Sequence, residues 1–443
     1  MESKTRKIGI VGGGLLGITL ALRLREHGFQ VTLIEAAPHL GGLASPTRIG
    51  NFTWDQFYHV ILASDTNLIR LLEQLNLKDQ IHWEQARTGF FTDGHLYSMS
   101  NIMEFLTFRP LTLTDKIRLG FTIFYASKVK VWERLEGVLV AEWLNRLSGK
   151  RTFNKIWLPL LKSKLGECYK ITSATFIWAT IARMYAARRS GLKQEMFGYV
   201  DGAYATILDR FQKVLKKEEV QTLCGNPVSK VVVNTSHTTV EMTGQRDMEF
   251  DEVILTIPCP RIPTLCPQLS VEEKERFRNV NYQGVICLAL ILRKPLAEYY
   301  ITNITDKGLP FTAVIEMTAV VDKKYVGGNS LVYLPRYLSP EDSFWKKEDD
   351  EIRGEFAEVL EGIYPSFKSE DILASKVVRA KEVFPITTLH YSSELLPATK
   401  TSLEHVFVVN SAQIPNGTMN MNEIVGLANR RSEEIAKILR SRV

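Results

Sequence analysis

The residues with the clearest chemical potential are glycines near the amino terminus. Gly12, Gly14 and Gly17 follow the pattern G-x-G-x-x-G, and Glu35 follows Gly17 by 18 residues. In this pattern the first glycine permits a tight turn, the second lets the backbone approach a pyrophosphate, and the third lets a helix pack closely on a strand. An acidic residue about 20 positions further on accepts a hydrogen bond from a ribose hydroxyl. The spacing therefore predicts a dinucleotide site.

The segments around these glycines have the elements that such a site requires. Residues 8–11 predict a short buried strand, and residues 31–34 predict a second strand that ends at Glu35. Apolar residues recur at helical spacing between them, and Gly28 stands where a helix end favours a left-handed glycine. The apolar run is too short to cross a membrane, and no signal-peptide cleavage site interrupts the pattern. We interpret residues 8–35 as a strand–helix–strand unit that binds a dinucleotide; the alternative is a glycine-rich turn in another unit of this shape.

The composition indicates a globular chain with more than one domain. The chain has 443 residues, 45% of them hydrophobic, and a net charge of +6. This mildly basic balance suits an anionic substrate, a membrane surface or an ordinary enzyme. The five cysteines form no C-x-x-C pair, which predicts a reducing, cytoplasmic compartment without a zinc site or disulfide framework. The histidines are scattered, so we expect no metal, and no basic run is interleaved with aromatic residues, so we expect no nucleic-acid partner.

The rest of the chain alternates between helical and strand-like patterns. A hairpin is expected to turn at Asp93-Gly94, and helical patterns cover residues 66–77, 101–190, 341–365 and the end of the chain. Residues 198–220 predict a turn followed by an amphipathic helix. Strand-like runs cover residues 228–233, 238–242, 253–257 and a block at 284–335. This order predicts one discontinuous cofactor domain interrupted by a substrate domain. The expected boundaries are 1–85, 196–265 and 385–443 for the cofactor domain, and 86–195 and 266–384 for the substrate domain.

Several of these segments resemble the superfamily of FAD-dependent amine oxidases, protoporphyrinogen oxidases and phytoene desaturases. Gly41-Gly42, six residues after Glu35, is similar to the start of its FAD site. The stretch "DQFYHVILASD" (55–65) resembles the loop beside the flavin, and "VFVVNSAQIPNGTMNMNEIVGLANR" (406–430) resembles the carboxyl-terminal flavin motif. One departure is Val409-Asn410-Ser411, where the family carries Gly-Asp. The resemblance implies an α/β fold: a Rossmann-type FAD-binding domain, glutathione-reductase-like and of the amine oxidase type, with an inserted α+β substrate domain.

The resemblance also implies which residues hold FAD. The expected set is Gly12, Gly13, Gly14, Leu15, Leu16, Gly17, Glu35, Ala36, Gly42, Leu43, His59, Val228, Asn410, Asn420 and Met421. The backbone of Val228 would hold the adenine. Asn420 and Met421 would begin a helix whose positive end stabilises negative charge on the flavin; the alternative for Met421 is core packing.

His59 is the candidate catalytic residue, since the resemblance puts it against the flavin ring. A neutral imidazole there would donate a hydrogen bond to flavin or substrate; the alternative is a buried structural histidine. Tyr58, Lys164 and Arg183 are the candidate substrate-binding residues. The two cations suit a carboxylate or diphosphate, and the alternative for each is a solvated helix face.

The expected function is that of an FAD-dependent oxidoreductase, which takes a hydride from a small or lipophilic substrate onto flavin N5. One alternative is a non-redox flavoenzyme that acts on a nucleotide or polyprenyl sugar, similar to UDP-galactopyranose mutase, although Leu165 stands where that enzyme has tryptophan. Another is a flavin-bound protein with a structural or assembly role. The sequence sets neither the substrate, the electron acceptor nor the oligomeric state.

A basic, amphipathic stretch at residues 109–132 leaves open a contact with membranes. It combines an apolar face with five lysine or arginine residues. We expect this helix to pack on the substrate domain. The alternative is that it lies on an anionic bilayer as a peripheral contact, at the inner face of the membrane, which would favour a lipophilic substrate.

Overall fold

The glycine-rich amino-terminal unit lies in a parallel sheet of five strands, in the order β10-β2-β1-β14-β20. The computed structural model describes residues 5–188, 196–416 and 419–442. The strands of this sheet are β1 (Lys7–Val11), β2 (Gln30–Ile34), β10 (Gln221–Leu223), β14 (Glu252–Leu255) and β20 (Val406–Val408). Because parallel strands end at the same edge, segments far apart in sequence meet at the carboxyl end of β1, where α/β sheets bind ligands.

This sheet is buried on both faces, and its side chains alternate between two cores. Ile10, Leu33 and Ile254 belong to one core, while Val11 and Leu255 belong to the other. A parallel sheet covered on both faces needs nearly continuous apolar strands, which explains the runs seen in the sequence. The helices of the first core are α1 (Leu15–Glu26), α2 (Thr66–Gln74), α8 (Ala203–Lys217) and α13 (Met421–Arg440).

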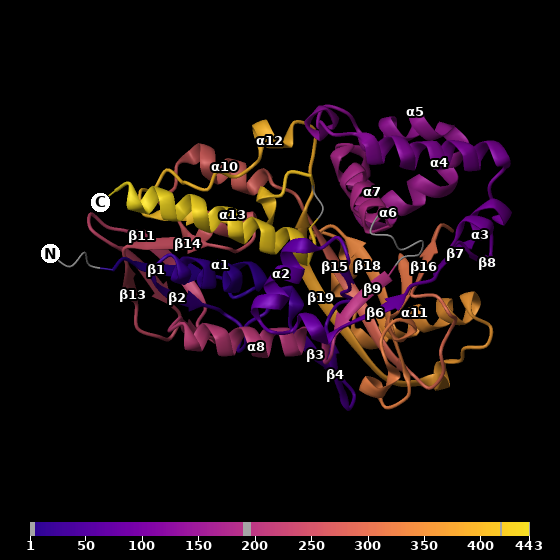
Figure 1. Ribbon diagram of the computed structural model, residues 1–443, viewed down its shortest axis with the longest axis horizontal. Coiled ribbons are helices and arrows are strands. Elements are labelled where there is room, and N and C mark those ends of the chain that lie inside the picture. Colours follow the sequence, from indigo (N-terminus) through magenta and orange to yellow (C-terminus); the bar gives the residue numbers. More distant parts are fainter. Residues whose placement is uncertain (1–4, 189–195, 417–418, 443) are drawn as a thin grey trace.

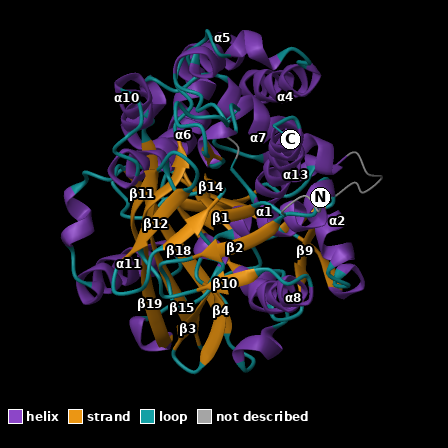
Figure 2. Ribbon diagram, turned by 90° about the vertical axis from the view of Figure 1, so that its left-hand side faces the viewer, coloured by secondary structure: helices purple, strands orange, loops and turns teal. Residues whose placement is uncertain are grey.

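The second core packs the sheet against an antiparallel meander and two helices. These elements are β11 (Val228–Val233), β12 (Thr238–Met242), β13 (Met248–Phe250), α9 (Ile262–Leu265) and α10 (Val271–Asn279). The meander connects β10 to β14, so that the chain leaves the parallel sheet and returns to it beside β1. Strands fill the centre of the molecule and helices lie around them (Figure 2).

A second sheet has seven strands in the order β19-β15-β18-β17-β16-β7-β8. Its strands are β7 (Thr88–Thr92), β8 (His95–Ser98), β15 (Tyr282–Leu292), β16 (Ile301–Ile304), β17 (Ala313–Glu316), β18 (Ser330–Leu338) and β19 (Ile372–Pro385). All of β15 is buried. Cys287 and Ala289 face one core, while Ile286 and Leu288 face another that includes α11 (Asp349–Ile363). Strand β15 is therefore covered on both faces and paired along both edges, with β19 and β18.

Five helices form a layer at the end of the molecule that lies away from the two termini (Figure 1). They are α3 (Ile102–Thr107), α4 (Leu113–Lys128), α5 (Val140–Thr152), α6 (Leu158–Leu165) and α7 (Thr175–Arg188). Trp143 and Leu144 of α5 are buried in the core of this layer. In the described residues, no helix combines the length and the apolar character needed to span a bilayer.

Two short sheets and one short helix complete the described structure. The first pairs β3 (Pro46–Ile49) with β4 (Phe52–Asp55), and the second joins β5 (Ile61–Leu62), β9 (Met196–Val200) and β6 (Ile81–Gln85). The helix is α12 (Tyr391–Glu394). The strand β4 ends at Asp55, where the segment that resembles the flavin-side loop begins.

The structure confirms the main elements expected from sequence. The strand–helix–strand unit is formed by β1, α1 and β2, and Gly28 follows α1 with a φ of +91°. The hairpin turns at Asp93-Gly94, where both residues have positive φ values of 54° and 71°. The expected strand at 253–257 ends earlier, at Leu255. The domain boundaries proposed from sequence stay a prediction.

A buried carboxylate in the second sheet predicts a pH-dependent stability. Burial raises the pKa of Glu316 from 4.5 to about 7, against the lowering effect of the Ala297 and Leu296 N–H groups that donate to its Oε2. Between these two values the unfolded state is ionised and the folded state keeps its proton. Rising pH should therefore reduce the free energy of unfolding, by about 1.4 kcal/mol per pH unit from this one group.

Glu316→Gln keeps an acceptor for both N–H groups and removes the titration. Urea denaturation of both proteins from pH 4.5 to 7 should show a smaller loss of stability with rising pH in the variant. Equal slopes in the two proteins would contradict the assignment.

Candidate functional site

The glycine turn between β1 and α1 is closely packed everywhere except at Gly14. A Cβ atom on Gly17 would lie 1.9 Å from the carbonyl oxygen of Gly12, and one on Gly12 would lie 2.4 Å from the hydroxyl of Thr256. Gly12 also has a φ of +114°, which favours glycine. A Cβ on Gly14 would meet no described atom within 4 Å. Gly14 therefore presents an open backbone surface, as the predicted pyrophosphate contact requires.

The amino end of α1 is suited to an anion. Gly14 is its N-cap, no side chain of the described residues caps it, and its first turn contains no acidic residue. In contrast, α3, α4 and α13 are capped by the side chains of Asn101, Thr112 and Asn420. Free N–H groups and the helix dipole together favour a phosphate at such an end. Leu15 and Leu16, which follow Gly14, are buried in the first core.

Glu35 connects three parts of the predicted dinucleotide site. Its Oε2 accepts from the Gly13 N–H at 2.6 Å, and its Oε1 accepts from the Ala37 N–H at 2.7 Å. Its carbonyl oxygen accepts from the N–H of Asn226, just before β11 and Val228. Each carboxylate oxygen has a second lone pair, so a ribose hydroxyl remains compatible with this geometry. The sequence assigned Glu35 to the ribose alone and did not reveal that it also holds the glycine turn.

A second glycine turn lies against the first. Gly41 forms a bridge to Gly14, and a Cβ on Gly42 would lie 3.0 Å from the Gly14 Cα. The side chain of Gln56 donates to the carbonyl oxygen of Gly42 at 2.7 Å. The structure therefore brings Gly42 beside the phosphate site and ties the 55–61 segment to it. Leu43 packs on the core of the second sheet, whereas Ala36 is exposed.

His59 faces a buried carboxylate. Its Nδ1 lies 3.6 Å from Oδ2 of Asp55, too long for a hydrogen bond, and among described residues this buried nitrogen has no hydrogen-bond partner. Burial raises the pKa of Asp55, and the neighbouring imidazole opposes that rise. Asp55 Oδ1 accepts from the Tyr204 N–H, and the Tyr204 ring lies 5.0 Å from the His59 ring. The imidazole therefore lies between a buried carboxylate and an aromatic ring, without a hydrogen bond from Nδ1 to any described residue.

Tyr58 and Lys164 meet through a residue that the sequence did not single out. The hydroxyls of Tyr58 and Tyr337 are 2.6 Å apart, and Lys164 Nζ donates to the Tyr337 hydroxyl at 2.5 Å. The same ammonium lies 3.9 Å from the Tyr337 ring centroid and 5.5 Å from that of Phe384. In the described part of the chain, no carboxylate forms an ion pair with Lys164. These residues, which we call the tyrosine–lysine cluster (Tyr58, Lys164, Tyr337 and Phe384), place one cation among aromatic rings.

Arg183 has a different environment from Lys164. Its guanidinium donates to both carboxylate oxygens of Asp65, at 2.8 to 3.2 Å, and this carboxylate is almost fully buried. Asp65 also accepts from the N–H of Leu62. The pair ties α7 to the start of α2. The substrate-binding role of Arg183 stays a prediction, and its charge is already balanced.

The carboxyl-terminal residues of the predicted site include two asparagines, Asn410 and Asn420, whose side chains accept hydrogen bonds from the backbone. Asn410 is buried: its amide donates to the Ile257 carbonyl at 3.0 Å, and its oxygen accepts from the Ala412 N–H. Asn420 caps α13 by accepting from the Glu423 N–H at 3.1 Å, and Met421 packs on the first core. These contacts hold the final motif at the edge where β1, β14 and β20 end. Residues 417–418 of this motif lie outside the described residues.

Three functional candidates were missed by sequence reasoning. Asp55 faces His59, Gln56 donates a hydrogen bond to Gly42, and Tyr337 is hydrogen-bonded to Tyr58. The spacing of Asp55 four residues before His59 was a usable signal, because acid–histidine pairs orient imidazoles. Tyr337 had no local signal, since it comes from β18.

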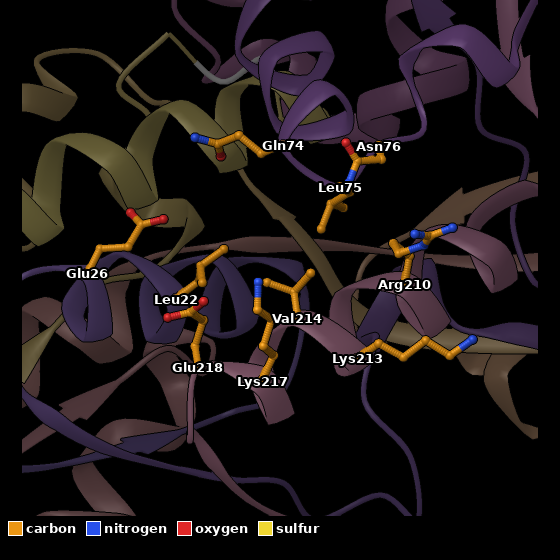
Figure 3. A pocket seen from close by; sticks show the side chains of 10 residues that line it. All are labelled: Leu22, Glu26, Gln74, Leu75, Asn76, Arg210, Lys213, Val214, Lys217 and Glu218. Carbon is orange, nitrogen blue, oxygen red and sulfur yellow. The ribbon is translucent and has the colours of Figure 1, made fainter.

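A surface pocket of about 440 Å3 lies elsewhere, between α1, α2 and α8. Figure 3 shows its lining side chains, among them Glu26 and Leu22 of α1 and the basic Arg210, Lys213 and Lys217 of α8. Leu22 and Glu26 are roughly 10–17 Å along the helix from its amino end. The pocket is therefore not the predicted phosphate site, and two of its charges are already paired, Glu26 with Arg23 and Lys213 with Asp209.

Comparisons with known proteins agree with this geometry. The family model described as "Flavin containing amine oxidoreductase" matches residues 17–408. Zeta-carotene desaturase from Synechocystis sp. is 20% identical over 411 residues, which cover 81% of this chain and 83% of that protein. Wild-type putrescine oxidase superposes with a TM-score of 0.73 at 17% identity, covering 97% of this chain and 99% of that one. Reduced UDP-galactopyranose mutase superposes with a TM-score of 0.75 at 15% identity, covering 98% and 96%.

The different packing of Gly14 and Gly17 gives a testable contrast. Gly14 has a φ of −69°, which any residue adopts, and open space beside it. Gly14→Val should therefore leave the melting temperature of the FAD-free protein unchanged but weaken FAD binding by roughly 100-fold or more, because the side chain fills the pyrophosphate position.

Gly17→Ala is the matched comparison, since its new Cβ would overlap the Gly12 carbonyl oxygen. It should lower the melting temperature of the FAD-free protein. Melting curves and FAD titrations of the wild type, Gly14→Val and Gly17→Ala test both expectations. An unchanged FAD dissociation constant for Gly14→Val would show that the pyrophosphate binds elsewhere.

Proposed function

The chain belongs to the flavin containing amine oxidoreductase family and is an FAD-dependent oxidoreductase, and we propose that it takes hydride from a lipophilic substrate that carries an acidic group. Bound FAD supplies the two-electron acceptor, at N5 of its ring. The remaining tasks belong to the chain: to hold the cofactor, to orient the substrate and to keep water out.

The residues around α1 fit the dinucleotide half of FAD. The open backbone at Gly14 and the uncapped N–H groups of α1 suit the pyrophosphate. Glu35 suits the adenosine ribose, and Val228 lies just after Asn226, whose N–H donates to Glu35. The amino end of α13 is capped by Asn420 and has Glu423 in its first turn, so it would add a smaller stabilisation, of negative charge on the flavin ring, than α1 adds at the pyrophosphate.

The observation that carries the substrate proposal is the connection from Gly42 to the tyrosine–lysine cluster. Gln56 is hydrogen-bonded to Gly42. Tyr58, two residues later, is hydrogen-bonded to Tyr337, which is in turn hydrogen-bonded to Lys164. Hydrogen bonds therefore connect the segment next to the predicted cofactor site with aromatic rings and one cation. Aromatic faces favour an apolar substrate body, and Lys164 favours an acidic substituent because no described carboxylate neutralises it.

The names of relatives support an apolar substrate body without identifying the substrate. One relative is named zeta-carotene desaturase, and a carotene is a hydrocarbon. Another is named coproporphyrinogen III oxidase, with 27% identity over 125 residues. Both names describe an oxidation, in one case of a long conjugated chain and in the other of a large precursor ring. Either oxidation fits hydride removal by a flavin.

The second candidate function is a non-redox reaction on a nucleotide sugar. Its support is Lys164, because a cation with no carboxylate partner among the described residues also suits a diphosphate, together with the structural likeness to UDP-galactopyranose mutase. The aromatic surroundings of Lys164 favour the first proposal, since a diphosphate sugar would need more polar partners than one ammonium group provides.

Anaerobic flavin reduction separates these functions. The FAD-loaded protein should lose its oxidised flavin absorbance when mixed with an apolar acid of the correct class, tested among porphyrinogens and carotenoid acids, with amines as a comparison. Nucleotide and polyprenyl sugars should leave the absorbance unchanged. Turnover of a nucleotide sugar only by the pre-reduced protein would favour the second candidate, and no reaction with any class would favour a structural role for the flavin.

We predict that His59→Ala retains FAD but loses turnover. The cofactor is held mainly through its dinucleotide half, whereas one lost hydrogen bond at the reacting centre costs on the order of a hundredfold in rate. His82→Ala is the matched control, because that imidazole also faces a carboxylate, Asp201 at 2.9 Å, but lies half-exposed on β6.

The control should keep both flavin and turnover. Flavin content, melting temperature and turnover are measured on one preparation of each protein. If His59→Ala melts lower but has normal turnover per bound flavin, His59 is a structural residue and the catalytic assignment fails.

A further inference from the structure

Most of the exposed large apolar side chains in the described residues lie in or next to the helices α3 and α4 of the helical layer. We define the α3–α4 face by nine of them: Ile102, Met103, Leu106, Leu113, Ile117, Phe121, Phe124, Tyr125 and Val131. Only three other large hydrophobic side chains are comparably exposed in the described residues. Single exposed apolar residues are ordinary on soluble proteins, but a contiguous group marks an interaction surface. The surface lies at the end of the molecule away from the termini (Figure 1).

Helix α4 is apolar on two opposite sides. Leu119, Thr122 and Ala126 are buried where α4 packs against α5 and α7. One side of the helix therefore packs within the helical layer. On the other side Ile117 and Phe121 are 64% and 52% exposed, where a surface helix normally carries charged residues. This outer stripe continues over about 17 Å of helix, from residue 113 to residue 124.

The charges beside this stripe are almost all positive. The exposed cations of residues 105–132 are Arg109, Arg118, Lys128 and Lys130. Within the whole face, residues 102–131, the acidic residues are Glu104, which accepts hydrogen bonds from Ser98 and Ser100, and Asp115, which is buried and completes the Thr112 cap of α4. Exposed Glu133 follows two residues after the face ends. Lys128 lies over the Phe124 ring at 5.3 Å, so a cation borders the apolar stripe. Apolar side chains bordered by lysine and arginine are typical of a helix that lies in the interface of an anionic bilayer.

We propose that the α3–α4 face docks on the surface of an anionic lipid bilayer. Its apolar side chains enter the boundary between headgroups and acyl chains, and Arg109, Arg118, Lys128 and Lys130 contact lipid phosphates. Charge complementarity selects this occupant, because a partner protein or second copy would have to present a matching acidic rim. The inference does not depend on the proposed substrate.

Vesicle sedimentation tests the proposal with the full-length, FAD-loaded protein. The probes are phosphatidylcholine vesicles with and without 30% phosphatidylglycerol. The wild type should sediment with the anionic vesicles and much less with the neutral ones. Replacing Lys128 and Lys130 by serine should weaken binding to anionic vesicles about fivefold for each lysine.

The apolar contribution is tested with Ile117→Glu/Phe121→Glu. Both side chains are exposed, so the variant should keep its flavin content and melting temperature while its vesicle binding falls by roughly 100-fold or more. Val271→Glu on α10 is the matched control, since Val271 is 64% exposed, as Ile117 is. This control should bind vesicles like the wild type.

Three results would overturn the proposal. The first is that the wild type sediments with neither kind of vesicle. The second is that the Ile117→Glu/Phe121→Glu variant binds as tightly as the wild type. The third comes from sedimentation equilibrium: a wild-type dimer that this variant separates into monomers, without vesicle binding, would identify a second copy of the chain as the occupant.

Discussion

The close approach of α1 to the end of β1 determines where the proposed cofactor site lies. A side chain at position 17 would overlap the carbonyl oxygen of Gly12, so only glycine lets the helix begin this near the strand. The Thr256 hydroxyl donates to that same oxygen and to the Val11 carbonyl, which ties the turn to the end of β14. Because this contact fixes the amino end of α1 at the edge of the sheet, its uncapped N–H groups face the region that suits a pyrophosphate.

The carboxylate of Glu35 has a role both in the fold and in the proposed cofactor site. Both of its oxygens accept backbone N–H groups, from Gly13 and Ala37. Charge-assisted hydrogen bonds of this kind are stronger than neutral ones. The residue that suits the ribose therefore also holds the glycine turn in shape. Affinity for the cofactor and local stability are coupled at this position, and a change in Glu35 affects both.

The link from the proposed cofactor site to the proposed substrate site runs through a few contacts of the 55–61 segment. Gln56 holds the second glycine turn, His59 faces buried Asp55, and Tyr58 reaches Tyr337 across the core of the second sheet. The helical layer supplies Lys164 from one side of this connection. On its outer side, the same layer carries the apolar α3–α4 face. One layer thus combines a cation toward the interior with an apolar surface toward the outside.

The sequence by itself determined the local elements and the cofactor class. Glycine spacing, two apolar strands and a terminal acid define the β1–α1–β2 unit, since each depends on backbone conformation and short-range periodicity. The structure decided which side chains meet. Tyr337 reaches Tyr58 across 279 positions, and Arg183 pairs with Asp65 across 118; no local pattern encodes such pairs. Likewise, the sequence of residues 109–132 predicted one apolar face, whereas the structure shows that α4 has a buried apolar side and an exposed one. Only tertiary packing decided this, because burial depends on where α5 and α7 lie.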